Sequence, residues 1–314
     1  VGKDFKLKKA CVNEHIFILR VNSDIIPKYL FYYLYSPIGQ ISILKDFRGA
    51  TVGGISKNFI NMQIYLPDLQ TQHKIVQVLD KAQALIDKRK EQIKLCDELI
   101  QSLFYDMFGD PFVENTEFKW TRLVDVTEIN PSKREVAAKD PKEKVSFVPM
   151  ENVGENGEIK TEQIMTIEEV YKGFTYFKEG DVLFAKITPC MENGKGAIAK
   201  NLYNGIGFGS TEFHVLRPIE NVSTSPWIFY LTKLKKFRKM AEMKMTGSAG
   251  QKRVPVSFLK EVNISVPPIE LQNQFAEKVQ KIEKQKQLLQ QSLALLEDNF
   301  NSLMQKAFRG ELFQ

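Results

Sequence analysis

Two long stretches of the chain place apolar residues at alternating intervals of four and three positions. The first runs from Thr71 to Phe108 and keeps one heptad register, with Arg89 as its single exception. The second begins at Phe275 and keeps the same register, with Lys286 as its exception. Such spacing is typical of two helices that pack along a narrow seam, so it predicts a coiled coil. The predicted seam residues are Ile75, Leu79, Ala82, Ile86, Ile93, Cys96, Ile100, Leu103 and Met107, followed in the second stretch by Phe275, Val279, Ile282, Leu289, Leu293, Leu296, Phe300, Leu303 and Ala307.

A second interpretation of these helices stays open, because a helix that lies on its own domain shows a wider apolar stripe. Val76, Val78, Leu85 and Leu99 widen the first stripe in this way. The single basic residue in each seam also has two interpretations. It can fix the register of the coiled coil, or its long side chain can reach out of the seam to solvent.

Proline and glycine mark the ends of both predicted helices. Prolines stand in the segments 64–72 and 264–272, and Gly109 and Gly310 follow the last seam residues. Proline suits a helix start and glycine suits the position just beyond a helix end. We therefore predict a first long spacer helix within 67–110 and a second within 267–314, running antiparallel. At 1.5 Å per residue the first helix is about 57 Å long.

The chain contains an internal repeat. Residues 59–108 match residues 259–308 without a gap, so that Gln72 falls on Gln272 and Phe108 on Phe308. Upstream, the match continues with small length changes, which are typical of loop insertions. Extending the match to Val1 leaves the first copy short of about 85 residues that the second copy has. The predicted order is half a globular domain (1–66), a long helix, a whole globular domain (111–266) and a second long helix.

The whole globular domain combines short apolar strands with helix. Strands are predicted at 145–150, 181–187, 196–200 and 212–218, and turns separate them. One amphipathic helix is predicted from Ser225 to Met243. The fold class expected for the chain is therefore α+β, with α/β globular domains joined by long antiparallel coiled-coil helices.

Three segments of the sequence carry residue types that bind nucleic acid. Lysines, hydroxyls and glycine backbone amides hold phosphates, whereas Asn and Gln can read adenine. A loop at 187–196 and a loop at 246–254 combine these residues, and the first copy has a counterpart at 49–57. The candidates are Lys186, Thr188, Asn193 and Lys195; Ser248, Gln251, Lys252 and Arg253; and Thr51 and Lys57. The third segment is a helical basic face formed by Lys233, Lys235, Lys236, Arg238 and Lys239. The alternative for the loops is a plain surface turn, and for the basic face a solvated surface.

Composition and charge change this picture little. The chain has 314 residues, 43% of them hydrophobic, and a net charge of +6, which permits a polyanionic partner without requiring one. The three cysteines form no CxxC pair, and no apolar run approaches the ~20 residues that span a bilayer. We expect a cytoplasmic protein with no membrane association.

Motifs for catalysis are not found. The segment at Ile129–Lys133 reads INPSK, which differs from the Asn-Pro-Pro-aromatic motif of amino-methyltransferases. The sequence contains no GxxxxGK[ST] phosphate loop. His15, His73 and His214 are far apart, and His15 and His214 are expected in apolar strands. The sequence therefore predicts a non-catalytic chain without a metal site or a cofactor of its own.

Several segments together resemble the specificity subunits of type I restriction-modification systems. They are FKEGDVLFAKITPCMENGKGAIA, GSTEFHVLRP, TGSAGQKRVPVSFLKEVNISVPPIELQNQFAEKV and LMQKAFRGELF. The resemblance implies that 111–266 is a complete target-recognition domain and that 1–66 is the second half of another. It further implies a bipartite double-stranded DNA target and helices that dock two methyltransferase (modification) subunits. Those subunits carry S-adenosylmethionine, and a separate restriction subunit carries the ATPase and nuclease activities. The shortened first copy departs from the family pattern, which leaves open whether it reads its half-site.

Two other classes of function remain open at this point. The chain can be an assembly scaffold, in which the coiled coil organises partners and the globular parts bind protein. It can also be a stand-alone modification methyltransferase, although the absent cofactor and target-base motifs argue against this class.

Overall fold

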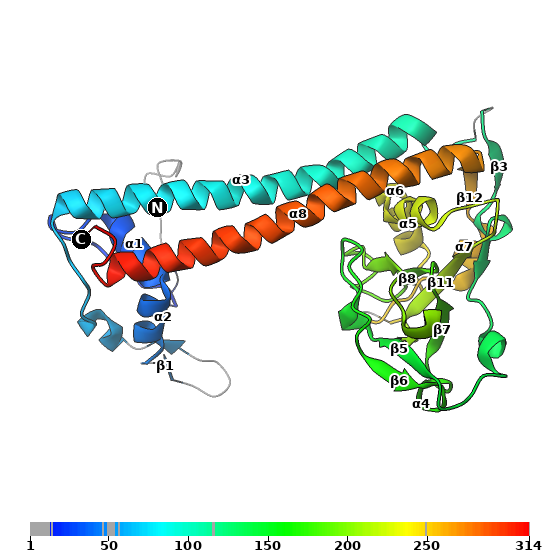
Figure 1. The fold of residues 1–314 in the computed structure, drawn as a ribbon, viewed down its shortest axis with the longest axis horizontal. Helices are drawn as coiled ribbons and strands as arrows, with labels where there is room; N and C mark the ends of the chain where they lie inside the picture. Colours follow the sequence, from blue (N-terminus) through cyan, green and yellow to red (C-terminus); the bar gives the residue numbers. More distant parts are fainter. Residues whose placement is uncertain are drawn as a thin grey trace. The chain divides into compact units, whose positions relative to one another are not determined.

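The computed structural model describes residues 13, 15–45, 47–48, 54–55, 57–114, 117–248 and 250–313. The chain forms two compact units, each described by itself. Unit 1 comprises Val1–Lys94 and Gln287–Gln314, and unit 2 comprises Leu95–Lys286. Two long helices contribute to both units, α3 (Leu69–Phe108) and α8 (Ile269–Phe308), each of 40 residues (Figure 1). Their bounds differ by the same 200 positions that separate the two sequence copies.

Unit 1 packs two short helices against parts of both long helices. These are α1 (Pro27–Tyr35) and α2 (Pro37–Leu44), and the unit also contains strands β1 (Phe47–Arg48) and β2 (Gly54–Ile55) and the 3-10 helix η1 (Lys57–Asn61). Its core joins tyrosines of α1 to apolar side chains of α3 and α8, among them Tyr29, Tyr33, Ile75, Leu79, Ile86, Phe300 and Phe308. His15 is exposed in a turn, so the prediction of an apolar strand at this residue is wrong. The reason is physical: within the described part of unit 1, no strand lies beside this segment to pair with it.

Unit 2 contains two four-stranded sheets and one two-stranded sheet. The first sheet has the order β6-β5-β10-β7 and the second β4-β11-β8-β9, while β3 pairs with β12. Only the β5–β10 pair is parallel among the described strands. The strands are β3 (Lys119–Arg122), β4 (Thr127–Ile129), β5 (Lys144–Val148), β6 (Ile164–Thr166), β7 (Thr175–Lys178), β8 (Val182–Ala185), β9 (Gly196–Ile198), β10 (Ile206–Gly209), β11 (Phe213–Pro218) and β12 (Asn263–Val266).

Short helices lie in the connections between these strands. They are α4 (Ile167–Val170), α5 (Ser225–Lys233), α6 (Lys235–Met243) and α7 (Val256–Glu261), with the 3-10 helices η2 (Leu123–Asp125), η3 (Lys133–Val136), η4 (Met150–Asn152) and η5 (Tyr203–Gly205). Strand β8 is buried at every position, because β11 and β9 flank its two edges and α5 packs against it. An uninterrupted apolar sequence is what such a strand requires. The four strands predicted within 145–218 correspond to β5, β8, β9 and β11.

The single helix predicted from Ser225 to Met243 is in fact two helices. The break lies at Leu234, whose ψ of 132° is extended rather than helical. Burial explains the break, because Leu234 and Phe237 both enter the core of unit 2. The interruption also leaves the carbonyl of Thr232 without a helical partner, and the Arg238 guanidinium donates to it at 2.6 Å.

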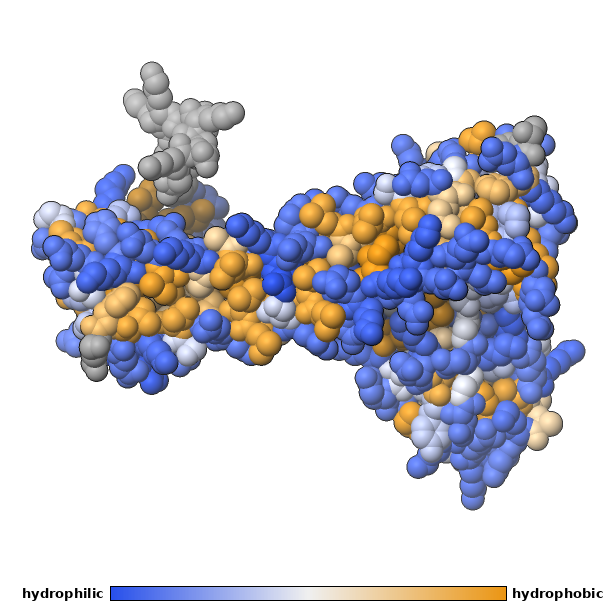
Figure 2. All heavy atoms as spheres, turned by 45° about the horizontal axis from the view of Figure 1, so that its top comes forward, coloured by the Kyte–Doolittle hydropathy of each residue, from blue (hydrophilic) through white to orange (hydrophobic). Residues whose placement is uncertain are grey.

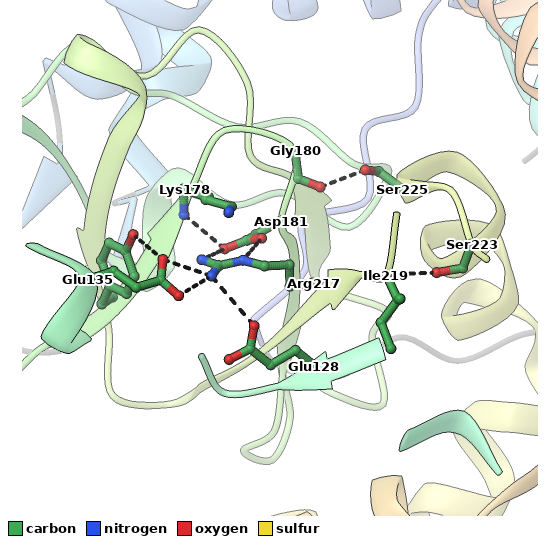
Figure 3. A network of polar contacts seen from close by, with 10 residues as sticks. Glu128, Glu135, Lys178, Gly180, Asp181, Arg217, Ile219, Ser223 and Ser225 are labelled. Atoms are coloured by element: carbon green, nitrogen blue, oxygen red, sulfur yellow. Dashed lines mark hydrogen bonds and ion pairs between the residues drawn. The ribbon is translucent and has the colours of Figure 1, made fainter. Parts of the chain in front are cut away.

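A buried arginine links the strands and turns of unit 2 (Figure 3). Arg217 on β11 donates through Nε to Asp181 at 2.8 Å and through Nη1 to Glu135 in η3 at 2.7 Å. Glu128 on β4 lies 3.6 Å from the same guanidinium. The Tyr176 hydroxyl on β7 donates to Glu135 at 3.0 Å, which connects the first sheet to the second. The Arg217 side chain is only 8% exposed and that of Asp181 only 1%, so this contact is shielded from solvent, whereas Glu135 and Glu128 are 41% and 51% exposed.

The two long helices pack antiparallel in both units, which confirms the predicted coiled coil. In unit 2, Phe104 of α3 meets Phe275 of α8, while Asp97 meets Lys286. In unit 1, Lys90 of α3 pairs with Glu297 of α8 at 2.8 Å. The seam residues named from the sequence divide into buried and partly buried ones. Ile75, Leu79, Ile86, Ile100, Val279 and Phe300 are buried, whereas Ile93, Leu103, Ile282, Leu289, Leu293, Leu296 and Leu303 are partly buried.

Some apolar side chains of the long helices lie outside the seam. Leu85 and Leu99, which widen the apolar stripe in the sequence, are 53% and 54% exposed. Leu288 and Leu295 of α8 are exposed as well. Figure 2 shows hydrophobic residues in patches between hydrophilic ones on one face of the surface. The seam is therefore narrow, as in a coiled coil, and it leaves these leucines exposed outside it.

Candidate nucleic-acid interface

Two loops of unit 2 that are distant in the sequence lie side by side. One joins β8 to β9 and the other joins α6 to α7. The backbone N–H of Thr188 donates to the carbonyl of Lys252 at 3.0 Å. The backbone N–H of Val254 donates in turn to the carbonyl of Lys186 at 2.9 Å. The two segments that carry nucleic-acid-binding residue types thus form one surface, which we call the paired loops.

The β8–β9 loop is held in shape by its own contacts. The N–H of Asn193 donates to the carbonyl of Pro189 at 3.0 Å, and the Thr188 hydroxyl donates to Glu192 at 2.6 Å. Met191 is fully buried beneath the loop. Polar side chains on the outside of such a loop are presented to solvent in a fixed arrangement.

Four candidate side chains of the paired loops are exposed to solvent. Asn193 is exposed on the β8–β9 loop, and Ser248, Gln251 and Lys252 are exposed on the α6–α7 loop. Amide and hydroxyl groups in this position can hydrogen-bond to base edges, and the lysine can pair with phosphate. The surface therefore combines both kinds of contact.

The cations of the paired loops differ in how far they are already neutralised. Arg253 makes a bidentate contact with Glu212 at 2.8 and 2.9 Å, and this guanidinium lowers the pKa of Glu212. The Lys195 ammonium donates to the carbonyl of Met150 at 3.3 Å. Arg253 therefore serves mainly to hold the loop, because its charge is compensated.

Lys186 is a half-buried cation without a comparable partner. Burial lowers the pKa of its ammonium, and Glu212 opposes this shift. Among the described residues, this ammonium makes no hydrogen bond and no ion pair, and Glu212 is the acidic group that acts on it. A desolvated cation of this kind gains most from an incoming anion.

The third predicted segment is not one solvated basic face. Arg238 is only 7% exposed, donates to the carbonyls of Thr232, Met191 and Gly194, and lies over the Phe184 ring at 4.5 Å. Its assignment to that face is therefore wrong, and burial lowers the pKa of its guanidinium to about 9. The physical reason is that loop carbonyls need a donor inside the fold, and Arg238 supplies five N–H groups.

Of the neighbouring lysines in that segment, some make contacts within the fold and others are simply exposed to solvent. Lys233 donates to the carbonyls of Glu155 and Gly194, and burial lowers its pKa to about 8. Lys236 pairs with Asp110 at 2.6 Å. Lys235 and Lys239 are exposed.

The first-copy candidates cannot be placed in the same way. Thr51 and the side chain of Lys57 lie outside the described residues.

A hydrogen-bonded relay that the sequence analysis did not identify supports the paired loops from behind. Asn130 accepts the N–H of Val215 at 2.9 Å through its side-chain oxygen, and its Nδ2 meets His214 Nδ1 at 3.2 Å. His214 Nε2 lies 2.8 Å from the carbonyl of Val254. Because Asn130 Nδ2 can only donate and the Val254 carbonyl can only accept, the imidazole is neutral and protonated at Nε2. Burial lowers the pKa of His214 accordingly.

Two features are absent from the described part of the chain. It holds no group of three or more His, Cys, Asp or Glu residues arranged to bind a metal ion. None of its helices is both long and apolar enough to cross a membrane.

The chain belongs to the family of type I restriction modification DNA specificity domains, whose model matches residues 1–95 and 115–298. Among its relatives is the type I restriction enzyme EcoAI specificity subunit of Escherichia coli, 39% identical over 189 residues. That alignment covers 60% of this chain and 32% of the relative. The EcoEI specificity subunit of the same organism is 40% identical over 159 residues, covering 50% of this chain and 26% of the relative. The matched region thus spans about a third or less of either relative.

The fold is shared with a solved structure. A chain from the work titled "Structural basis underlying complex assembly and conformational transition of the type I R-M system" aligns with 91% of this chain and 72% of its own length. The TM-score is 0.56 at 19% sequence identity. The α+β fold class with long helices, expected from the sequence, is confirmed by this likeness.

Proposed function

We propose that this chain is a non-catalytic specificity subunit that recognises a double-stranded DNA sequence. The observation that supports it best is the joining of two polar, basic loops into one exposed surface in unit 2. Family membership points to the same function.

The residues of the paired loops have different roles in binding DNA. Lys252 and Lys186 supply charge for phosphates, which gives affinity but carries no sequence information. Asn193 and Gln251 are exposed amides of the kind that pair with adenine N6 and N7 in the major groove. Arg253 and Glu212 keep the α6–α7 loop in register with the loop beside it.

The proposal extends to the assembly in which the chain works. Unit 2 contains the recognition domain for one half of a bipartite site, and unit 1 serves the other half. The long helices dock two methyltransferase subunits, and their exposed leucines outside the seam are suitable apolar contacts. S-adenosylmethionine and ATP are then bound by the methyltransferase and restriction subunits, not by this chain.

A salt titration distinguishes this function from that of an assembly scaffold. Binding of the full chain to a labelled duplex pool is measured by fluorescence anisotropy between 50 and 200 mM NaCl. A protein that contacts several phosphates loses affinity steeply, with a linear relation between log K and log salt. Absence of DNA binding at low salt, with intact binding to the methyltransferase subunits, would favour the scaffold.

A further inference from the structure

A cavity of about 360 Å³ opens beside the paired loops in unit 2. It is bounded by the segment Asn130–Lys133 and by Tyr176 in β7. Lys186, which follows β8, and Thr211, which lies just before β11, also line it. With Ile129 before it, the first of these segments reads INPSK, which does not match a methyltransferase motif. Its place in the fold gives it another role.

The cavity is basic. Lys186 and Lys133 both line it, and none of its lining residues is acidic. Lys133 donates one hydrogen bond to the carbonyl of Tyr171 at 2.7 Å, which leaves two of its three ammonium hydrogens for a ligand. Lys186 is half-buried and has no hydrogen-bonding partner among the described residues. Thr211 and Ser132 add hydroxyl groups to the same lining.

The nearby carboxylates are occupied by arginines. Glu212 is held by Arg253 through two contacts, and Glu135 is held by Arg217 and by the Tyr176 hydroxyl. Neither glutamate lines the cavity. The two lysines are therefore the charges that a ligand in the cavity meets first.

The walls are fixed before any ligand arrives. The Tyr176 hydroxyl donates to Glu135. Glu135 in turn accepts from the buried Arg217, as Figure 3 shows. On the other side, Asn130 is tied to His214, which is tied to the α6–α7 loop at Val254. A pre-arranged cationic cavity binds an anion without a large ordering cost.

We propose that this cavity is a subsite for one backbone phosphate of the bound DNA, with Lys186 as its main contact and Lys133 as its second. The subsite rests on the proposed DNA-binding function and adds the INPSK segment to the contact surface. It also couples that contact to the paired loops, because Lys186 lies at the start of the β8–β9 loop.

The test begins with a duplex that the full chain enriches from a random pool. For Lys186→Gln, the slope of log K against log salt should decrease in magnitude by about 0.9, the value for one lost phosphate contact. Lys186→Arg should restore the slope. Lys160→Gln serves as the control, since Lys160 is an exposed lysine of unit 2 outside the cavity and the paired loops. Thermal melting of each variant checks that the fold is retained.

A methylphosphonate scan of the same duplex locates the phosphate. The phosphates are neutralised one at a time. At one position, neutralisation should weaken DNA binding by the wild-type chain but should not weaken DNA binding by the Lys186→Gln variant any further. If every neutralised position weakens both proteins equally, the phosphate subsite is wrong, while DNA binding itself still stands. If the wild-type chain enriches no duplex and binds none at low salt, the proposed function fails instead.

Discussion

Arg217 holds three acidic side chains from a position that solvent barely reaches. Asp181, one of its partners, is 1% exposed and depends on Arg217 for charge compensation. Removing one partner of a buried ion pair leaves an uncompensated charge, which is more costly than replacing both.

We predict that Arg217→Met lowers the free energy of unfolding of unit 2 by about 3 to 5 kcal/mol. Urea unfolding followed by tryptophan fluorescence measures the change. The exposed pair Arg122–Asp125 provides the control, and Arg122→Met should change the stability by less than about 1 kcal/mol. Equal effects of the two substitutions would show that the buried network has no special role.

His214 gives unit 2 a pH dependence whose sign follows from its lowered pKa. The unfolded chain takes up a proton near the ordinary value of 6.5, whereas folded His214 takes it up only at lower pH. The unfolded state therefore binds more protons as pH falls below about 6.5, and stability decreases there. Its stabilising contribution is complete above that value. The groups facing the ring are Asn130 and the Val254 carbonyl, with Glu212 and Lys186 nearby.

The measurement compares urea unfolding of the wild-type chain and His214→Gln between pH 5 and pH 7.5. The wild-type chain should lose more stability than the variant as pH falls from 6.5 to 5. Parallel pH profiles of the two proteins would assign this loss to other groups.

At the scale of elements, each of the two sequence copies uses an equivalent glutamine to hold a short helix against a long one. Gln72 accepts the N–H of Ile26 just before α1 and donates to the carbonyl of Pro67. Gln272 accepts the N–H of Thr224 just before α5 and donates to the carbonyl of Pro267. Both side chains are fully buried. The repeat in the sequence is thus a repeat of contacts.

We predict that Gln72→Leu and Gln272→Leu each lower the free energy of unfolding by roughly 1 to 3 kcal/mol. The reason is that each leaves a buried N–H and buried carbonyls unpaired. Urea unfolding of the two variants measures the losses, and each variant is the matched control of the other. A loss at one position only would mean that the two clamps are not equivalent.

The seam between α3 and α8 provides the second prediction at this scale. Leu293 is partly buried in the core of unit 1, so Leu293→Asp places a charge there and should reduce helix content and complex assembly. Circular dichroism and size-exclusion chromatography with the methyltransferase subunits measure the two effects. Asn299→Asp is the control because Asn299 is an exposed polar residue of α8 outside the seam. If Leu293→Asp keeps helix content and assembly as fully as Asn299→Asp does, an intact seam is not required for assembly.

The sequence predicts the long helices well because their periodicity is local. The heptad register and the flanking prolines and glycines specify α3 and α8 to within a few residues. The break at Leu234 was not predicted, because it depends on which side chains the core accepts and on the carbonyls that Arg238 satisfies. Those contacts come from residues distant in the sequence.

At the scale of the whole molecule, the same distinction holds for the candidate site. Both polar loops could be identified from composition alone. Their adjacency could not, because it arises from hydrogen bonds across more than sixty positions between Thr188 and Lys252. The cavity beside them was missed for the same reason, since the INPSK segment and Lys186 meet only in the folded chain. The sequence shows which loops carry polar and basic residues, and the fold supplies their grouping.

The most direct test of the account is selection from a random duplex pool by the full chain bound to its methyltransferase subunits. The account predicts that the wild-type chain enriches one recurring motif. Asn193→Ala combined with Gln251→Ala should relax the motif at one or two positions, each worth about 1 to 3 kcal/mol of discrimination, while the salt slope is kept. Enrichment of no motif, or of an identical motif by the double variant, would contradict recognition through the paired loops.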